Sequence, residues 1–383
     1  MRKKRLRPSI LCMFMAVSLL GIGFLLSPVS SALAAGNRDV AGHVYVLNNT
    51  AQANSITVFN RFADGGLVYV TRTRIGGQGS GSGLGSQGSL ILSPDRNWLF
   101  AVDAGSNQIS VVAVGEDGSL TPTSVTSSGG VVPISLTYSN GRLYVVNAGD
   151  STNAANVAGF RVHHDGTLSL IPGSTQPLST ANPGPAQVQA DPSGDTLVVT
   201  EKSTNEIDSY SIHANGSLSG PTVTASTGSE PFGFAFNPAH PSQFIVSDAF
   251  GGAANAGTLT SYRLHGSNVS LLDGPVGDQQ TAPCWVAITK DGHFAYTSNT
   301  GSGSVSAYSI GSHGSLTLLT SASTGSGSSP IEMALTSSSR YLYVLDSGTA
   351  SLSAFQVRSD GSLVAVGLGS ISLPSSSVGL AAD

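Results

Sequence analysis

The sequence has little charge and almost no cysteine. Only 10% of its 383 residues are charged, and its two cysteines are Cys12 and Cys284. Cys12 lies in an N-terminal segment that we expect to be removed, so one cysteine remains and no intrachain disulfide can form. The fold must then be stabilised by core burial. A hydrophobic content of 40% is too high for a disordered chain.

Positive charge is also scarce in the body of the chain. Five of the 17 basic residues lie within the first seven positions, which leaves 12 against 22 acidic residues after Ala34. A chain with this balance repels nucleic-acid phosphates and anionic membranes. We therefore expect no nucleic-acid partner.

The first 34 residues have the three zones of a signal peptide. A basic run precedes an apolar stretch from Ile10 to Leu26, and small residues at 30–34 suit a signal peptidase. The alternative is a retained anchor, because about 17 apolar residues is the lower limit for crossing a bilayer. Pro28 and the small residues favour cleavage. The sequence predicts a secreted or extracytoplasmic protein without stable membrane insertion after cleavage.

A glycine turn followed by Leu or Val recurs seven times, at intervals of 47 to 53 residues. Such turns close tight hairpins. Seven units of about 50 residues fill positions 40–383 and leave no room for a second domain. The recurring glycines are Gly65, Gly118, Gly166, Gly216, Gly266, Gly314 and Gly361.

Each unit is expected to form four strands. An alternating run such as 109–114 precedes the turn, a denser apolar run such as 99–102 precedes that, and a short strand usually entered by proline comes first. Seven four-stranded antiparallel units predict an all-β fold, a seven-bladed β-propeller. The first unit lacks its inner strand, and residues 377–382 are expected to supply it and close the ring.

Strand order predicts which side chains meet at one mouth of the central channel. The ends of the second strands should converge there with the starts of the inner strands. These polar residues are either a ligand site or caps of the turns that follow, and capping is favoured for all but Glu201. The aligned positions are Asn48, Asp103, Asn147, Glu201, Asp248, Ser298 and Asp346.

Few cations are expected near the mouth. Arg72, Arg74 and Lys202 fall there, whereas a phosphorylated ligand calls for several Arg or Lys. Trp285 and Phe232 either stack on a sugar ring or belong to the core.

Two other patterns do not predict a cofactor or metal. Residues 83–88 match G-x-G-x-x-G, but they lead into a strand and not a helix, so 76–88 is interpreted as a Gly/Ser-rich loop between the first two units, and a candidate lid. His163 and His164 are adjacent, so a strand would point them to opposite sides. We expect no cofactor and no metal.

Residues 40–383 resemble the lactonase-type seven-bladed propellers, which include 6-phosphogluconolactonase and the carboxymuconate cycloisomerases. The strongest match is 184–187, 191–194 and 197–201. Glu201 stands where that family has a glutamate, whereas Ala186 and Gln187 replace an expected Arg and His. The segments 133–136 and 231–234 lack a His and an Arg in the same way.

The resemblance implies a lactone hydrolase or related isomerase. With a signal peptide and few cations at the mouth, we expect a secreted enzyme that acts on a neutral sugar or organic-acid lactone. Glu201 would be the general base, and Asn147, Lys202 or backbone N–H groups would stabilise the oxyanion. The alternative is a non-catalytic extracytoplasmic binding or scaffold propeller. A monomer is expected in either case. The candidate substrate-binding residues are Asp103, Asn147, Asp248, Asp346, Lys202, Arg72 and Trp285.

Overall fold

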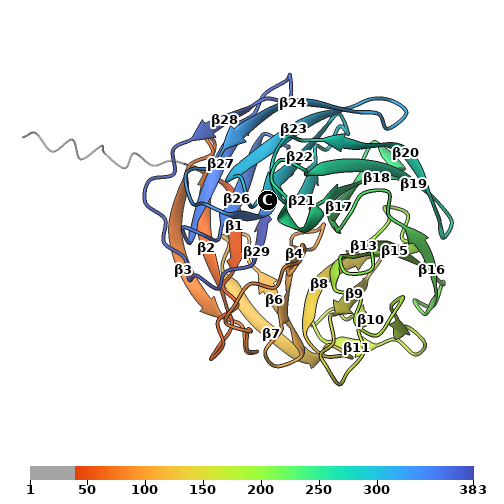
Figure 1. Ribbon diagram of the computed structural model, residues 1–383. Coiled ribbons are helices and arrows are strands. Elements are labelled where there is room, and N and C mark those ends of the chain that lie inside the picture. The colour runs from red at the N-terminus through yellow and green to blue at the C-terminus, as the bar shows by residue number, and fades with distance from the viewer. Residues whose placement is uncertain (1–38) are drawn as a thin grey trace, which may run out of the picture. The chain divides into compact units, whose positions relative to one another are not determined.

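The computed structural model describes residues 39–383, so the signal peptide predicted for residues 1–34 lies outside the described residues. Seven antiparallel sheets surround a common axis (Figure 1). This arrangement confirms the predicted seven-bladed propeller. We number blade 1 as β29-β1-β2-β3 and the following blades in chain order.

Each blade has an inner strand at the axis and a second strand beside it. The inner strands are β4 (Leu90–Leu92), β8 (Pro133–Ser139), β13 (Pro185–Ala190), β17 (Pro231–Asn237), β21 (Pro283–Ile288), β25 (Pro330–Leu335) and β29 (Gly379–Ala382). The second strands are β1 (Val40–Leu47), β5 (Trp98–Asp103), β9 (Arg142–Asn147), β14 (Thr196–Glu201), β18 (His240–Asp248), β22 (Phe294–Asn299) and β26 (Tyr341–Asp346).

Two further strands complete each blade, and the outer strand of blade 3 is split in two. The third strands are β2 (Ser55–Phe62), β6 (Gln108–Val114), β10 (Asn156–Val162), β15 (Glu206–Ile212), β19 (Thr258–His265), β23 (Ser304–Ile310) and β27 (Ser351–Val357). The outer strands are β3 (Leu67–Arg74), β7 (Leu120–Ser127), β11 (Leu168–Leu170) with β12 (Gln176–Pro177), β16 (Leu218–Ala225), β20 (Asn268–Gly277), β24 (Leu316–Ser323) and β28 (Leu363–Val366).

Helix is nearly absent from residues 39–383. The helical element there is the three-residue 3₁₀ turn η1 (Phe250–Gly252). No helix in this part of the chain has the length and apolar character needed to cross a membrane.

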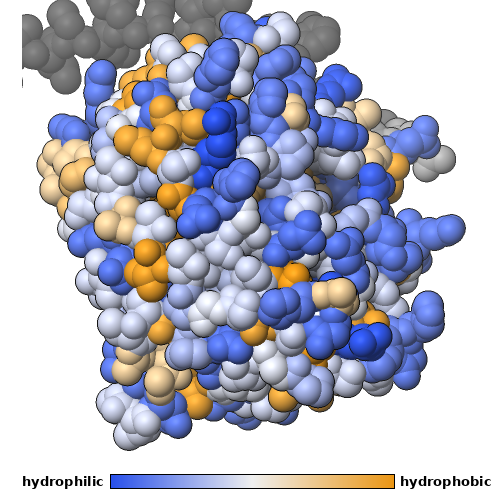
Figure 2. All heavy atoms as spheres, turned by 90° about the vertical axis from the view of Figure 1, so that its right-hand side faces the viewer, coloured by the Kyte–Doolittle hydropathy of each residue, from blue (hydrophilic) through white to orange (hydrophobic). Residues whose placement is uncertain are grey.

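Burial explains why the second strands are apolar on both faces. Residues 143–146 of β9 and 342–345 of β26 are completely buried, because both faces of a blade pack against neighbouring blades. The outer strands instead meet solvent. Figure 2 shows one side of the ring, where apolar residues are separate spots among polar ones, in keeping with exposed Val223 on β16 and Leu271 on β20.

The recurring glycine turns also set the spacing between blades. Gly65 and Gly361 have positive φ angles, and a Cβ on either would lie within 2.5 Å of an aromatic ring of the preceding blade, Tyr341 or Phe294. The same turns accept hydrogen bonds from buried tyrosines. The Tyr343 hydroxyl donates to the Gly65 carbonyl at 2.8 Å. Glycine is required there for both turn conformation and close approach.

The last strand closes the ring as predicted. β29 pairs with β1, with Leu380 opposite Val46 and Ala381 opposite Tyr45, and it lies beside β1 in Figure 1. Beyond the ladder, the Asp383 amide donates to the His43 carbonyl at 3.1 Å. This pairing removes the free sheet edges that an open array would have.

Closure makes one prediction about stability. Leu380 is buried in the closing strand, so Leu380→Ala should lower the free energy of unfolding by about 3 kcal/mol, measured by urea denaturation. Leu170→Ala is the matched control, because Leu170 is half exposed on β11 and should change stability by less than about 0.5 kcal/mol. Equal losses in the two variants would contradict a closing role for β29.

Candidate functional site

Strand register places the predicted mouth positions at the same end of their blades. In five blades the proline that opens the inner strand pairs with the last residue of the second strand. In blade 6 this partner is Asn299, so it and not Ser298 takes the aligned position. The pairs are Pro133–Asn147, Pro185–Glu201, Pro231–Asp248, Pro283–Asn299 and Pro330–Asp346.

Four of the predicted substrate-binding side chains are buried inside their own blades. Asp103, Asn147, Asp248 and Asp346 are at most 2% exposed, and each hydrogen-bonds to the third strand. They fasten the second strand to the third just below the mouth. The bonds are Ser110 to Asp103 at 2.6 Å, Asn147 to Asn156 at 2.9 Å, Thr260 to Asp248 at 2.6 Å and Ser353 to Asp346 at 2.6 Å.

Glu201 is also fully buried. One carboxylate oxygen accepts the Ser179 amide at 3.1 Å, and the other accepts the hydroxyls of Ser179 and of Thr204, the latter at 2.6 Å. Burial and the adjoining Glu201 carboxylate raise the pKa of Asp208 to about 8. Through its bonds to Ser179, Glu201 holds the loop before β13 in place, and both of its carboxylate oxygens already accept hydrogen bonds.

Arg72 lies away from the axis. Its Nε donates to the Thr57 hydroxyl at 3.3 Å. It lines a cavity of about 280 Å³ with Arg74 and the loop around Gln52, over blade 1.

The centre of the mouth is filled by residues 84–88, which we call the plug segment. The Ser86 hydroxyl donates to the Ile134 carbonyl of blade 3 at 2.8 Å, and the Gln87 amide donates to the Ala186 carbonyl of blade 4 at 3.1 Å. The Trp285 indole of blade 6 donates to the Ser86 carbonyl at 3.0 Å. The loop predicted at 76–88 thus crosses the axis.

The Gln87 side chain makes the most specific of these contacts. Its Nε2 donates to the Val286 carbonyl at 2.8 Å, and its Oε1 accepts the Val286 amide at 3.1 Å. Gly233 makes room for it, because a Cβ there would lie 2.3 Å from Gln87 Oε1. Gln187 bonds to Phe234 of blade 5 in the same two-point way, at 2.9 and 2.7 Å.

Two predicted residues border the plug segment. Lys202 Nζ donates to the Gly85 carbonyl at 2.5 Å and lies 4.7 Å from the ring centroid of Phe232. Burial lowers the pKa of Lys202 to about 8. Trp285 is 4% exposed and packs on Phe232 with ring centroids 5.1 Å apart.

The plug segment separates two small cavities on the axis. The outer one, about 290 Å³, is bordered by Trp285 and Ile331 together with the hydroxyl-bearing residues Ser347, Ser375 and Ser377, and no charged residue lines it. The inner one, about 260 Å³, is lined by Gln87, Thr137, Gln187, Gln189 and Glu332.

Glu332 is the acidic residue that lines this inner cavity, and the sequence analysis missed it. Its carboxylate accepts the Gly88 amide at 3.1 Å and the Met333 amide at 3.2 Å. Burial raises the pKa of Glu332 to about 8. It stands two positions after Pro330, as Gln187 stands two after Pro185. Alignment of the inner strands at this position is the sequence signal by which Glu332 would have been found.

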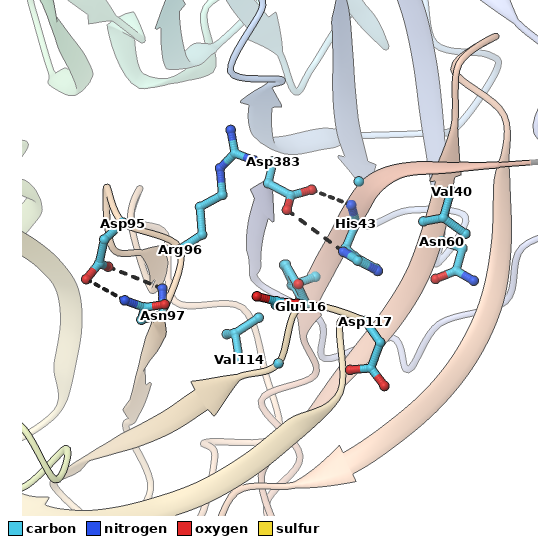
Figure 3. Close-up of a pocket in the computed structure, with 13 residues that line it drawn as sticks. Val40, His43, Asn60, Asp95, Arg96, Asn97, Val114, Glu116, Asp117 and Asp383 are labelled. Carbon is cyan, nitrogen blue, oxygen red and sulfur yellow. Dashed lines mark hydrogen bonds and ion pairs between the residues drawn. The ribbon is translucent and has the colours of Figure 1, made fainter.

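A larger cavity, about 720 Å³, lies at the other end of the blade 1 and 2 strands (Figure 3). None of the predicted site residues lines it. Asp383 approaches His43 there, and Asp95 binds the Asn97 amide group at 2.9 Å. It surrounds the joint where the ring closes. Within residues 39–383, no three His, Cys, Asp or Glu side chains gather as a metal ion would require.

The fold and its axial site define a closed seven-bladed propeller with its candidate site at one mouth of the channel. The chain belongs to the family described as Lactonase, 7-bladed beta-propeller, whose sequence pattern matches residues 42–176 and 243–369. No match was found among the curated proteins.

Solved structures show the same fold at low identity. The periplasmic gluconolactonase of Pseudomonas aeruginosa is 17% identical with a TM-score of 0.72, over 89% of this chain and 98% of that one. A Bacteroides fragilis protein assigned provisionally as a 6-phosphogluconolactonase is 18% identical with a TM-score of 0.69, over 91% and 99%. At these identities the likeness shows the fold alone.

The buried carboxyls of the mouth predict a pH dependence of stability. Burial raises the pKa of Asp103 to about 6 and those of Asp248 and Asp346 to about 7. A carboxyl with a higher pKa in the folded than in the unfolded state binds more protons when folded. The free energy of unfolding should therefore fall as the pH rises from about 4 to about 8, which thermal denaturation across this range measures.

In Asp248→Asn, the free energy of unfolding should fall less steeply with rising pH, by about 1 kcal/mol per pH unit. Asp360→Asn is the control. The Ser362 hydroxyl and amide lower the pKa of Asp360, so its contribution is lost only at more acidic pH, and the slope above pH 5 should not change. An unchanged slope in Asp248→Asn would contradict the assigned titration.

Proposed function

We propose that the chain hydrolyses a neutral sugar or organic-acid lactone at the channel mouth. Membership of the lactonase family supports the reaction class. The observation that carries the substrate class is the outer cavity, which is bordered by Trp285 and serines and by no charged residue. A phosphorylated lactone would need several cations, and no Lys or Arg lines this cavity.

We assign the general base to Glu332. A base must reach the attacking water. Glu332 lines an axial cavity and accepts one backbone amide on each carboxylate oxygen, whereas Glu201 accepts three hydrogen bonds from Ser179 and Thr204 beneath the loop before β13. The Glu332 carboxylate takes a proton from water as the water oxygen bonds to the lactone carbonyl carbon. The ring C–O bond then breaks, and the leaving oxygen takes that proton, giving the hydroxy acid.

Lys202 is the proposed donor to the oxyanion. Its ammonium already donates to a carbonyl oxygen at the mouth, and preorganised donors of this kind stabilise a developing negative charge. Asn147 serves this role less well, because it is completely buried inside its blade, whereas Lys202 is partly exposed at the mouth.

The test is turnover of a lactone panel by the mature protein. Glu332→Gln should lower kcat/KM by about 100-fold or more without loss of thermal stability, since it removes a buried ionisable group. Because the base acts when deprotonated, wild-type kcat/KM should rise with pH up to about 8, the pKa of Glu332 in the free protein.

Glu201→Gln is the matched comparison, and it tests the sequence-derived assignment of the base. We expect it to lower stability by disturbing the Ser179 loop, with a smaller effect on kcat. If folded Glu201→Gln loses turnover and Glu332→Gln retains it, Glu201 is the base. Absence of wild-type turnover on every lactone would reject the hydrolase and leave the non-catalytic binding propeller.

We propose that the protein works outside the cytoplasm, supported by the signal-peptide pattern of residues 1–34. Intact-mass measurement of exported protein should find a chain beginning at Ala35. The variant Ala32→Phe/Ala34→Phe should block cleavage. Full-length wild-type protein in the membrane fraction would instead support a retained anchor.

A further inference from the structure

The plug segment is bonded in the way that a ligand is bonded. It donates hydrogen bonds to inner-strand residues of several blades and accepts hydrogen bonds from others. The inner-strand atoms that take part face the axis. Inner strands have a neighbouring strand on one side only, so their free edges need other partners. Ile134, Ala186 and Val286 offer carbonyl oxygens to it, and Val286 and Leu136 offer amides.

The plug segment lies between two anchored stretches. On one side, the Gly79 and Gly81 amides donate to the loop carbonyls of Thr50 and Asn49, each at 2.9 Å. On the other side, the Ser89 carbonyl accepts the Val102 amide at 3.0 Å next to β4. A Cβ built on Gly83 meets no atom within 4 Å, so there is open space at the entry to the segment. Residues 84–88 can therefore leave the axis with both anchors intact, at the loss of their hydrogen bonds and of the packing of Leu84 on the core.

We propose that the plug segment occupies the ligand site, and that a neutral ligand rich in hydroxyl or amide groups displaces it and takes over its hydrogen bonds. This proposal rests on the proposed function, because the displacing ligand is taken to be the lactone substrate that binds at the channel mouth. Displacement joins the outer and inner cavities into one space, in which the ligand meets Glu332, Gln187 and Trp285.

The exposed partners define the chemistry of this ligand. Removal of the plug segment leaves the carbonyls of Ile134, Ala186 and Val286 and the Glu332 carboxyl as acceptors. A ligand that left them unpaired would lose affinity. Hydroxyl and amide groups donate as well as accept, so they match this set. Displacement also frees the Lys202 ammonium, but a phosphate or carboxylate would face the Glu332 carboxyl and three carbonyl oxygens and is disfavoured.

Gln87 is the side chain that holds the plug segment in its closed position, because its amide nitrogen and oxygen both bond to the Val286 backbone. Gln87→Ala deletes these two bonds and leaves Val286 unpaired in the closed state. The open fraction should then rise about tenfold, and the apparent Kd of a ligand should fall by the same factor. Gln78→Ala is the matched control. Gln78 is exposed in the same tract and bonds through its backbone to Ser106 and Gly105.

Binding is measured on the mature protein by the fluorescence of Trp285, which donates to the plug segment. The chain has two tryptophans, so the background variant Trp98→Phe leaves Trp285 as the single emitter. The probe is glucono-δ-lactam, a neutral ring that resists hydrolysis, and gluconate is its anionic comparator. We expect the lactam to change Trp285 emission, Gln87→Ala to bind it about tenfold more tightly, and gluconate to bind at least tenfold more weakly.

Hydrogen exchange on the wild-type chain tests the same gate without a substitution. The lactam should accelerate exchange of the Gln87 and Gly88 amides, whose acceptors it takes over, while β13 and β21 stay protected. Unchanged or slower exchange at 84–88, or equal lactam affinity in Gln87→Ala and Gln78→Ala, would overturn the proposal.

The experiments distinguish rejection of the displaceable plug segment from rejection of the proposed hydrolase activity. If lactones are hydrolysed but Gln87→Ala changes neither Kd nor KM, the plug segment is structural and the inference is wrong. If the lactam displaces the plug segment and no lactone is hydrolysed, the gated site stands and the hydrolase is rejected.

Discussion

The ladder between β29 and β1 is the interaction on which the rest of the structure depends. It joins chain positions more than 300 residues apart, and it turns seven sheets in series into a ring. Only in a ring do the seven inner strands face one axis. The channel, its mouth and every contact across the axis follow from this closure, since none of them involves a single blade alone.

A ring of inner strands leaves free backbone edges at its centre, and this chain pairs them with its own residues 84–88. The Gly/Ser composition of the tract fits this position. Glycine avoids steric conflict where the chain crosses close to other backbones, and Gly233 opposite gives the Gln87 side chain its space. Burial raises the pKa of Glu332, and the Gly88 amide of this segment lowers it in part. The segment therefore affects both the access to the axis and the ionisation of the acid beside it.

The polar residues at the second-strand ends illustrate what a sequence pattern can and cannot say. Their recurrence predicted a shared location, and Asn147, Asp248 and Asp346 each pair with the proline that opens the inner strand of the same blade. Their direction was not in the pattern. Strand alternation assigns a side chain to a face, but whether that face is open depends on the polar side chains of the third strand, which hydrogen-bond to these residues inside the blade. Glu332, on an inner strand, bonds to the backbone amides of Gly88 and Met333 and lines the axial cavity.

The sequence by itself determined the fold, because repeat length, glycine turns and strand alternation are local properties, each repeated seven times. It also determined the closing strand, since the first unit lacked one and the last residues supplied it. Only the tertiary structure decided the site. That residues 84–88 cross the channel, that Glu201 is enclosed by the Ser179 loop, and that Glu332 lines the axis all depend on contacts between blades. Such contacts join residues far apart in the chain and leave no periodic signal in it.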